Sequence, residues 1–142
     1  MPTPGKKVLC HLVFLLGVVS LIMCSAMAAR AAGSPSIQVA EASICLDVVD
    51  LQCQGGDTIF SSSLGKLYCF TRIVGAKEPT TIFHVWYHGQ KQRARVPLQV
   101  NSSNWRTYSS KIIQAHETGD WRVEVLGPND ELLRVVHFKV VP

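Results

Sequence analysis

TIFHVWYH, residues 81–88, is the stretch of sequence that decides the fold. Its side chains fall into two alternating sets with a period of two residues, which is typical of a half-buried β-strand. The set that we expect to point into the core is Phe83, Val85 and Tyr87. The set that we expect to point toward solvent is Ile82, His84, Trp86 and His88. The opposite orientation is also open, because β-sandwiches often bury a tryptophan on a central strand.

Six more segments of the chain have a strand-like pattern, and residues with a physical reason to form turns separate them. These segments are residues 37–50, 66–74, 92–100, 105–113, 120–127 and 132–141. No stretch shows sustained helical periodicity, although residues 40–49 would also fit a helical turn or two. Seven short strands at this spacing predict an all-β fold, an antiparallel immunoglobulin-like β-sandwich rather than a barrel.

The start of the chain, residues 1–31, is typical of a signal peptide and is set apart from the fold. Lys6 and Lys7 precede an apolar run, and small residues suited to cleavage after Ala28 or Ala31 follow that run. The sequence therefore predicts an exported protein of the periplasm or of another extracytoplasmic compartment.

One domain, residues 32–142, remains after the leader, and its length suits a single hydrophobic core. The apolar run of the leader is shorter than the roughly 20 residues that a membrane-spanning helix needs. An uncleaved anchor over residues 8–29, held in the inner membrane, is the alternative. A membrane is thus expected as a partner only through this N-terminal segment.

The charge of the chain argues against nucleic acid as a partner. The whole sequence has 14 Lys and Arg against 10 Asp and Glu. Lys6, Lys7 and Arg30 lie in or beside the leader, so the domain itself is close to neutral. Phosphate contacts need a basic stripe, and the domain has none.

Three cysteines fall in the domain, which limits it to one internal disulfide. Cys45 and Cys69 both lie in strand-like segments, where they could face each other across a sheet in an oxidising compartment. We expect this pair to be bridged, with two free buried thiols as the alternative. Cys53 lies in the turn-like LQCQGGD, residues 51–57, and has no evident role. No metal site and no cofactor are expected, because none of the three has a close Cys or His neighbour.

Three blocks of the sequence resemble a known family. The blocks are TRIVGAKEPTTIFHVWYHGQ, NWRTYSSK and GDWRVEVLGPNDELLRVVHFKV, at residues 71–90, 104–111 and 119–140. Together they resemble the signature blocks of a bacterial family of envelope-associated domains, domain of unknown function 2914. The resemblance extends from about Ser43 to Val140. It implies a small all-β domain with no established activity, so it supports the fold and leaves the function open.

Two central strands are expected to form a binding patch with their outward side chains. In residues 120–127, the alternating Trp121, Val123 and Val125 make the core face. If this strand lies beside residues 81–88, one outer surface carries an imidazole, an indole ring, a cation and a carboxylate, from His84, Trp86, Arg122 and Glu124. Such a surface suits a sugar ring or an extended peptide. The alternative is cross-strand pairing that only stabilises the sheet.

The segment WRTYSSK, residues 105–111, extends this hypothesis, since one of its two alternating sets must point outward. Its candidate hydrogen-bonding side chains are Arg106, Ser109, Ser110 and Lys111. Their alternative role is a solvated strand edge that resists aggregation.

Catalysis has little support in the sequence. No nucleophile elbow is present, and His84 and His88 lie roughly 13 Å apart along a strand, too far to share one metal. We therefore expect no enzyme, but a non-catalytic binding or interaction module of the cell envelope whose partner is a glycan or a protein. The alternative is a structural accessory domain with no ligand of its own.

Overall fold

The computed structural model describes residues 36–142, which belong to one compact unit, Gly33–Pro142. The expected leader, residues 1–31, and the alternative anchor, residues 8–29, lie outside the described residues. Among residues 36–142, no helix is long and apolar enough to cross a membrane. The regular structure of this part is β-strand, apart from one turn of 3₁₀ helix, η1 (Ser62–Leu64). The prediction of an all-β fold is confirmed.

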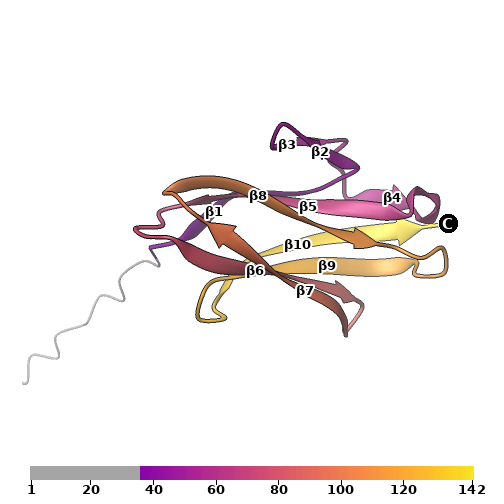
Figure 1. Ribbon diagram of the computed structural model, residues 1–142. Helices are drawn as coiled ribbons and strands as arrows, with labels where there is room; N and C mark the ends of the chain where they lie inside the picture. Colours follow the sequence, from indigo (N-terminus) through magenta and orange to yellow (C-terminus); the bar gives the residue numbers. More distant parts are fainter. Residues whose placement is uncertain (1–35) are drawn as a thin grey trace, which may run out of the picture. The chain divides into compact units, whose positions relative to one another are not determined.

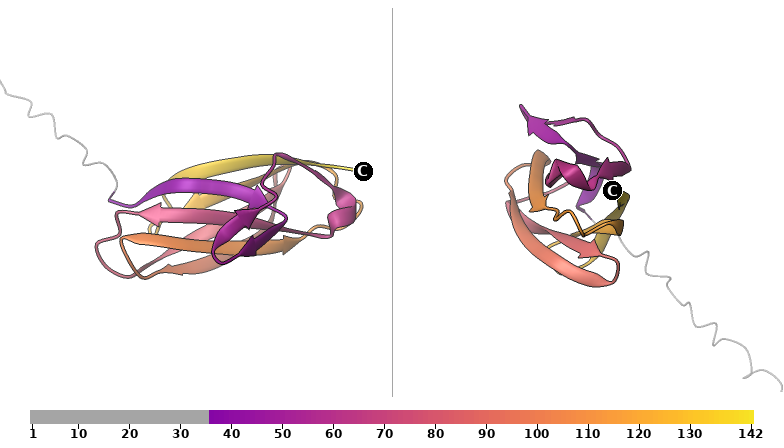
Figure 2. Two further views of the ribbon diagram at one scale, coloured as in Figure 1. Left: turned by 90° about the horizontal axis from the view of Figure 1, so that it is seen from above. Right: turned by 90° about the vertical axis from the view of Figure 1, so that its right-hand side faces the viewer.

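Two sheets lie one over the other in two layers (Figures 1 and 2). The three-stranded sheet has the order β1-β5-β8 and is built from β1 (Gln38–Cys45), β5 (Lys66–Val74) and β8 (Asn104–Ile112). The five-stranded sheet has the order β4-β10-β9-β6-β7 and is built from β4 (Ile59–Ser61), β10 (Leu132–Val141), β9 (Gly119–Leu126), β6 (Thr80–His88) and β7 (Lys91–Val100). Neighbouring strands are antiparallel except β4 and β10, which are parallel.

A small hairpin stands apart from both sheets, on the outer side of the three-stranded one (Figure 1). It consists of β2 (Asp47–Val49) and β3 (Gln52–Gln54). Its two central turn residues, Asp50 and Leu51, both have positive φ, 50° and 55°. Positive φ at both central residues is typical of the type I′ turn, whose twist matches that of the two strands it joins. Asn and Gly are the usual residues of this turn.

Six of the seven expected strands are found within one residue of their predicted bounds. The remaining expected segment, residues 37–50, is wrong as one strand, because the chain leaves the sheet after Cys45 and enters the hairpin as β2. The strands β3 and β4 are absent from the prediction. Each has only three residues, too few to show a period.

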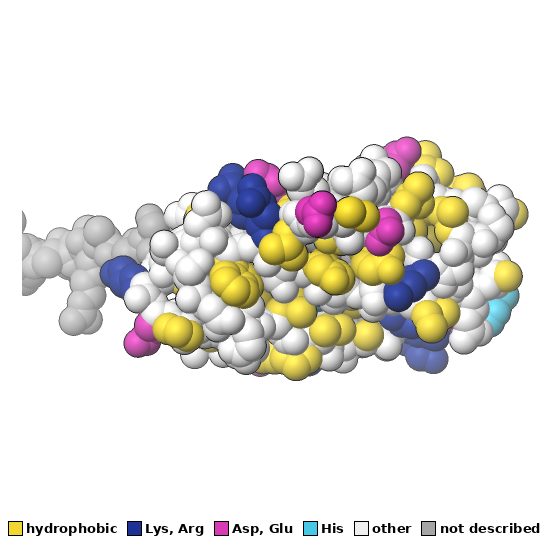
Figure 3. All heavy atoms as spheres, turned by 45° about the horizontal axis from the view of Figure 1, so that its top comes forward, with side chains coloured by type: hydrophobic (Ala, Val, Ile, Leu, Met, Phe, Trp, Pro, Cys, Tyr) yellow, Lys and Arg dark blue, Asp and Glu magenta, His cyan; other side chains and the backbone are white. Residues whose placement is uncertain are grey.

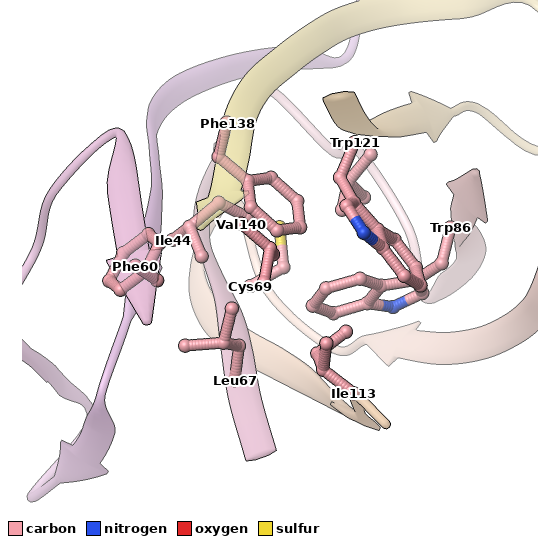
Figure 4. Packing of buried hydrophobic residues seen from close by; sticks show 10 residues of the cluster. Ile44, Phe60, Leu67, Cys69, Trp86, Ile113, Trp121, Phe138 and Val140 are labelled. Atoms are coloured by element: carbon pink, nitrogen blue, oxygen red, sulfur yellow. The ribbon is translucent and has the colours of Figure 1, made fainter. Parts of the chain in front are cut away.

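The two layers meet in a core of aromatic and aliphatic side chains (Figure 4). The three-stranded layer and the segments that flank it contribute Ile44, Leu67, Cys69 and Ile113. The five-stranded layer contributes Phe60, Trp86, Trp121, Val123, Phe138 and Val140. The ring of Trp121 stacks on Phe138 with centroids 6.0 Å apart, and the ring of Trp86 meets Phe138 edge-on with centroids 6.1 Å apart. A second cluster around Ile73, Ile82, Val100 and Val125 continues the core.

The expected orientation of β6 is wrong. Ile82, His84 and Trp86 point inward, and each is 0% exposed. Phe83 and Tyr87 point outward and are half-buried. The alternative that buries the tryptophan is the one that occurs. For β9 the expected orientation is correct, since Trp121, Val123 and Val125 are buried and β9 pairs with β6.

The expected disulfide between Cys45 and Cys69 is also wrong. Cys45 is bonded to Cys53, and Cys69 is a free, buried thiol. The register explains the difference, because Cys69 lies opposite Ile44 while Cys45 lies opposite Tyr68. Successive side chains of a strand point to opposite faces, so Cys69 enters the core and Cys45 points away from it. Cys45 therefore meets the hairpin, which it fastens to the outer side of the sheet.

Candidate interaction surface

Three of the residues expected at a solvent-facing site lie instead in a buried polar cluster between the two sheets. His84 Nδ1 is 2.8 Å from Ser109 Oγ, and His84 Nε2 is 3.1 Å from Thr71 Oγ1. Trp86 Nε1 donates to the same Ser109 Oγ at 3.0 Å. Sequence reasoning missed Thr71, because the other inward side chains of its strand β5, Leu67, Cys69 and Ile73, are apolar. The cluster links β6 of one sheet to β5 and β8 of the other.

Burial lowers the pKa of His84 to about 3. The cause is that the interior stabilises an imidazolium poorly and offers hydroxyl and indole groups around His84, with no carboxylate in hydrogen-bond contact. A neutral imidazole can donate one hydrogen bond and accept another, which matches the two hydroxyls beside it. His84, Trp86 and Ser109 thus satisfy one another, and none of them is available on the surface.

Arg122 and Glu124 point outward from β9, as expected, but their neighbours are not the expected His84 and Trp86. Arg122 Nε donates to Glu124 Oε1 at 2.9 Å, and its guanidinium lies 3.9 Å from the ring centroid of Tyr87. Arg95 of β7 lies over Phe83 in the same way, at 4.0 Å. Each cation therefore covers the outward aromatic ring of β6. The two cation–ring contacts thus join neighbouring strands of the sheet, whereas the Arg122–Glu124 ion pair lies within β9.

Lys111 and Glu117 belong to a charged cluster where the chain leaves β8. Glu117 is buried, its Oε2 accepts from Gln114 N at 3.0 Å, and its Oε1 contacts Arg93 as an ion pair without hydrogen-bond alignment. Burial alone would raise the pKa of Glu117. The bond from Gln114 and the charges of Arg93, Lys111 and His116 outweigh burial and hold this pKa below its ordinary value. The cluster ties the turn after β8 to β7.

Five of the eight large hydrophobic side chains that are exposed lie on one side of the domain. We call this side the hairpin face: the outward side chains of β1, β5 and β8 together with the hairpin that stands on them. Its exposed large hydrophobic residues are Leu46, Val49, Leu51, Tyr108 and Ile112. Figure 3, in which this side comes forward, shows hydrophobic side chains interspersed with basic and acidic ones. Exposed hydrophobic side chains that gather on one face are a common feature of interaction sites.

The strands β5 and β8 and the tip of the hairpin place the side chains of the hairpin face. Arg106, Tyr108 and Ser110 alternate outward from β8 and are exposed. The ring of Tyr108 lies beside that of Tyr68 on β5, with centroids 6.0 Å apart. Leu51 sits at the hairpin tip, 48% exposed. Of the residues predicted for a binding site, only Arg106 and Ser110 therefore reach this face.

Two other kinds of site have weak support. A shallow hollow of about 340 Å³ opens beside the first residues of β9, lined by Thr58, Asp120, Trp121, His137, Phe138 and Lys139. Its two aromatic side chains already pack in the core. No group of three or more His, Cys, Asp or Glu side chains within residues 36–142 is arranged to hold a metal ion.

Comparison with known proteins gives a family and no activity. No curated protein matches the chain. Residues 79–140 match the model of a family described as "Protein of unknown function (DUF2914)". The match runs from just before β6 to the penultimate residue of β10. It is shorter than the expected resemblance, which began at Ser43. Residues 79–140, which hold all three motifs HVWY, WRTYSSK and GDWRVEV, are therefore similar to the DUF2914 family of proteins of unknown function.

Proposed function

We propose that the chain is an exported, non-catalytic interaction module of the bacterial cell envelope, built as an immunoglobulin-like β-sandwich and binding a protein through its hairpin face. The expectation of export rests on the leader-like sequence of residues 1–31. The expectation of a binding role rests on the surface that the domain presents.

The strand order supports the immunoglobulin-like assignment. The order β1-β5-β8 corresponds to strands A-B-E of that fold, and β10-β9-β6-β7 corresponds to G-F-C-C′. Trp86 then occupies the position of the buried tryptophan of strand C. Trp121, near the start of strand F, donates from Nε1 to Glu117 O at 2.8 Å. This bond resembles the corner in which an aromatic side chain of strand F bonds to backbone a few residues upstream.

One observation carries the proposed role: His84 and Trp86, the imidazole and indole expected at a binding site, are sealed between the sheets, while five large hydrophobic side chains lie exposed on the hairpin face. A disulfide holds the hairpin in place, which reduces the entropy lost when a partner binds. Apolar and tyrosine side chains with a few charges are typical of protein interfaces. A protein is therefore favoured over a glycan.

A matched pair of exposed leucines tests the proposal. Leu51 is 48% exposed on the hairpin and Leu132 is 58% exposed at the start of β10. Leu51→Asp should weaken capture of a partner from envelope extract by full-length protein, and Leu132→Asp should not. Aspartate tolerates the positive φ of position 51 better than leucine, so the thermal midpoint should not fall. Equal capture by both variants would contradict a role for the hairpin face and favour a structural domain.

A further inference from the structure

The free edge of β8 is the longest regular edge in the described domain. β8 ends the three-stranded sheet and pairs with β5 over nine residues without a register shift. Gly65 O accepts from Ile113 N, and Ser103 O accepts from Gly75 N, each at 3.0 Å. These bonds show that odd-numbered residues of β8 direct their backbone groups toward β5. Because backbone groups alternate along an antiparallel strand, the even-numbered residues direct theirs toward the open side.

The centre of this edge has no partner, whereas its two ends are closed. Ser102 Oγ donates to Asn104 O at 3.0 Å, and Lys111 Nζ donates to Ile112 O at 2.8 Å. Among residues 36–142, no hydrogen bond reaches the outward backbone groups of the three residues between them. Those residues are Arg106, Tyr108 and Ser110. Three N–H donors and three C=O acceptors are thus presented side by side.

The other edges of the two main sheets are protected in ways that β8 is not. The edge strand β7 contains Pro97 and a bulge in its pairing with β6. The edge strand β1 has a bulge after Val39, and Arg134 donates to Val39 O at 2.9 Å. The edge strand β4 has only three residues. Prolines, bulges and short edge strands are the usual means of preventing strand addition, so β8 is open by contrast.

Beneath the open side of β8, the inward face of β7 is incompletely covered. Ala94, Val96 and Leu98 lie directly opposite Trp86, His84 and Ile82 in the sheet and share their inward face. The three β6 residues are fully buried, but the three β7 residues are only half-buried. The five-stranded layer therefore extends past the three-stranded layer on this side. A strand added to β8 would cover these apolar side chains.

We propose that β8 binds an extended peptide segment of a partner protein by strand addition. The segment pairs antiparallel with residues 106–110 and turns alternate apolar side chains toward Ala94, Val96 and Leu98. Arg106 makes no ion pair within the described residues, so an acidic side chain on the outward face of the segment complements it. This inference rests on the proposed function and names the chemistry of its partner.

Amide hydrogen exchange of the full-length protein tests the inference with a defined probe. The probe is a short acetylated and amidated peptide in which valine alternates with threonine, with one glutamate on the threonine face. The amides of Arg106, Tyr108 and Ser110 should exchange about tenfold more slowly, or slower still, when the probe is bound. The amides of Thr107 and Ser109 already bond to β5 and should not change. The same peptide with N-methyl groups on its pairing edge should give no protection.

A proline variant tests the same edge from the side of the protein. Ser110→Pro removes a donor that faces the open side and leaves the ladder with β5 intact, a placement that edge strands tolerate. It should abolish the protection, whereas the matched Ser110→Ala should keep it. The N-methylated peptide provides the test on unaltered protein if the proline variant does not fold.

Three results would overturn strand addition. The first is that millimolar peptide does not slow the exchange of the three amides. The second is that the N-methylated peptide slows their exchange as well. The third is that sedimentation shows a dimer that Ser110→Pro dissociates, which would assign the edge to a second copy of the chain. The Leu51→Asp experiment is independent of these results. If Leu51→Asp weakens partner capture while the three amides stay unprotected, the hairpin face binds and the edge does not.

Discussion

Acidification should destabilise the domain through His84. The folded state holds this imidazole at a pKa of about 3, against an ordinary value of 6.5. Below pH 6.5 the unfolded chain therefore binds a proton that the folded chain does not bind. The stability contributed by neutral His84 is complete above pH 6.5 and is lost as the pH falls toward 3. Between pH 7 and pH 5 the loss is about 2 kcal/mol, at 1.36 kcal/mol for each pH unit below 6.5.

Urea unfolding at a series of pH values, followed by tryptophan fluorescence, measures this loss. The window from pH 7 to pH 5 lies above the range in which most carboxylates titrate, including Glu117, whose pKa is lowered. His84→Gln replaces the imidazole with an amide, which can donate and accept hydrogen bonds but is not protonated in this pH range. Its free energy of unfolding should be lower at pH 7 and should fall less by pH 5. Parallel curves for wild type and His84→Gln would refute the reasoning.

Three further outcomes are expected. Ser109→Ala should lower the free energy of unfolding by about 1 to 3 kcal/mol, because it leaves His84 Nδ1 and Trp86 Nε1 without this partner. The control Ser110→Ala should change the free energy of unfolding by less than about 0.5 kcal/mol. Urea unfolding measures both. Cys53→Ser should cost about 2 to 3 kcal/mol, since it opens a disulfide of sequence separation 8. Burial raises the pKa of the Cys69 thiol, so peptide mapping should find Cys69 alkylated only after unfolding.

Strand positions follow from the sequence, because each long strand carries an alternating pattern between turn residues. The orientation of a strand follows only when its two faces differ in polarity. In β9 they differ, with Trp121 and Val123 on one face and Arg122 and Glu124 on the other. In β6 both faces carry aromatic and aliphatic side chains, so hydrophobicity does not decide between them. The candidate site depended on β6 and was misplaced for that reason.

The disulfide was mispredicted for a different physical reason. A one-residue difference in register decides whether two cysteines on neighbouring strands share a face. Nothing local to Cys45 or Cys69 reveals that register. Cys53, by contrast, is close to Cys45 along the chain, and the hairpin that returns it is marked only by the unusual turn at Asp50 and Leu51. The turn lacks the glycine that commonly signals such hairpins.

The buried polar cluster explains why β6 takes the orientation that its hydrophobicity leaves undecided. If β6 were turned over, its outward set of Phe83, Val85 and Tyr87 would face the other sheet. The hydroxyls of Thr71 and Ser109 would then lie in an apolar interior without His84 and Trp86 as partners. Each buried polar group left unpaired costs about 1 to 3 kcal/mol. In the observed orientation every member of the cluster has a hydrogen-bond partner. The hydrogen bonds between the two sheets therefore determine which face of β6 points inward. His84 and Trp86 thus stabilise the fold rather than bind a ligand.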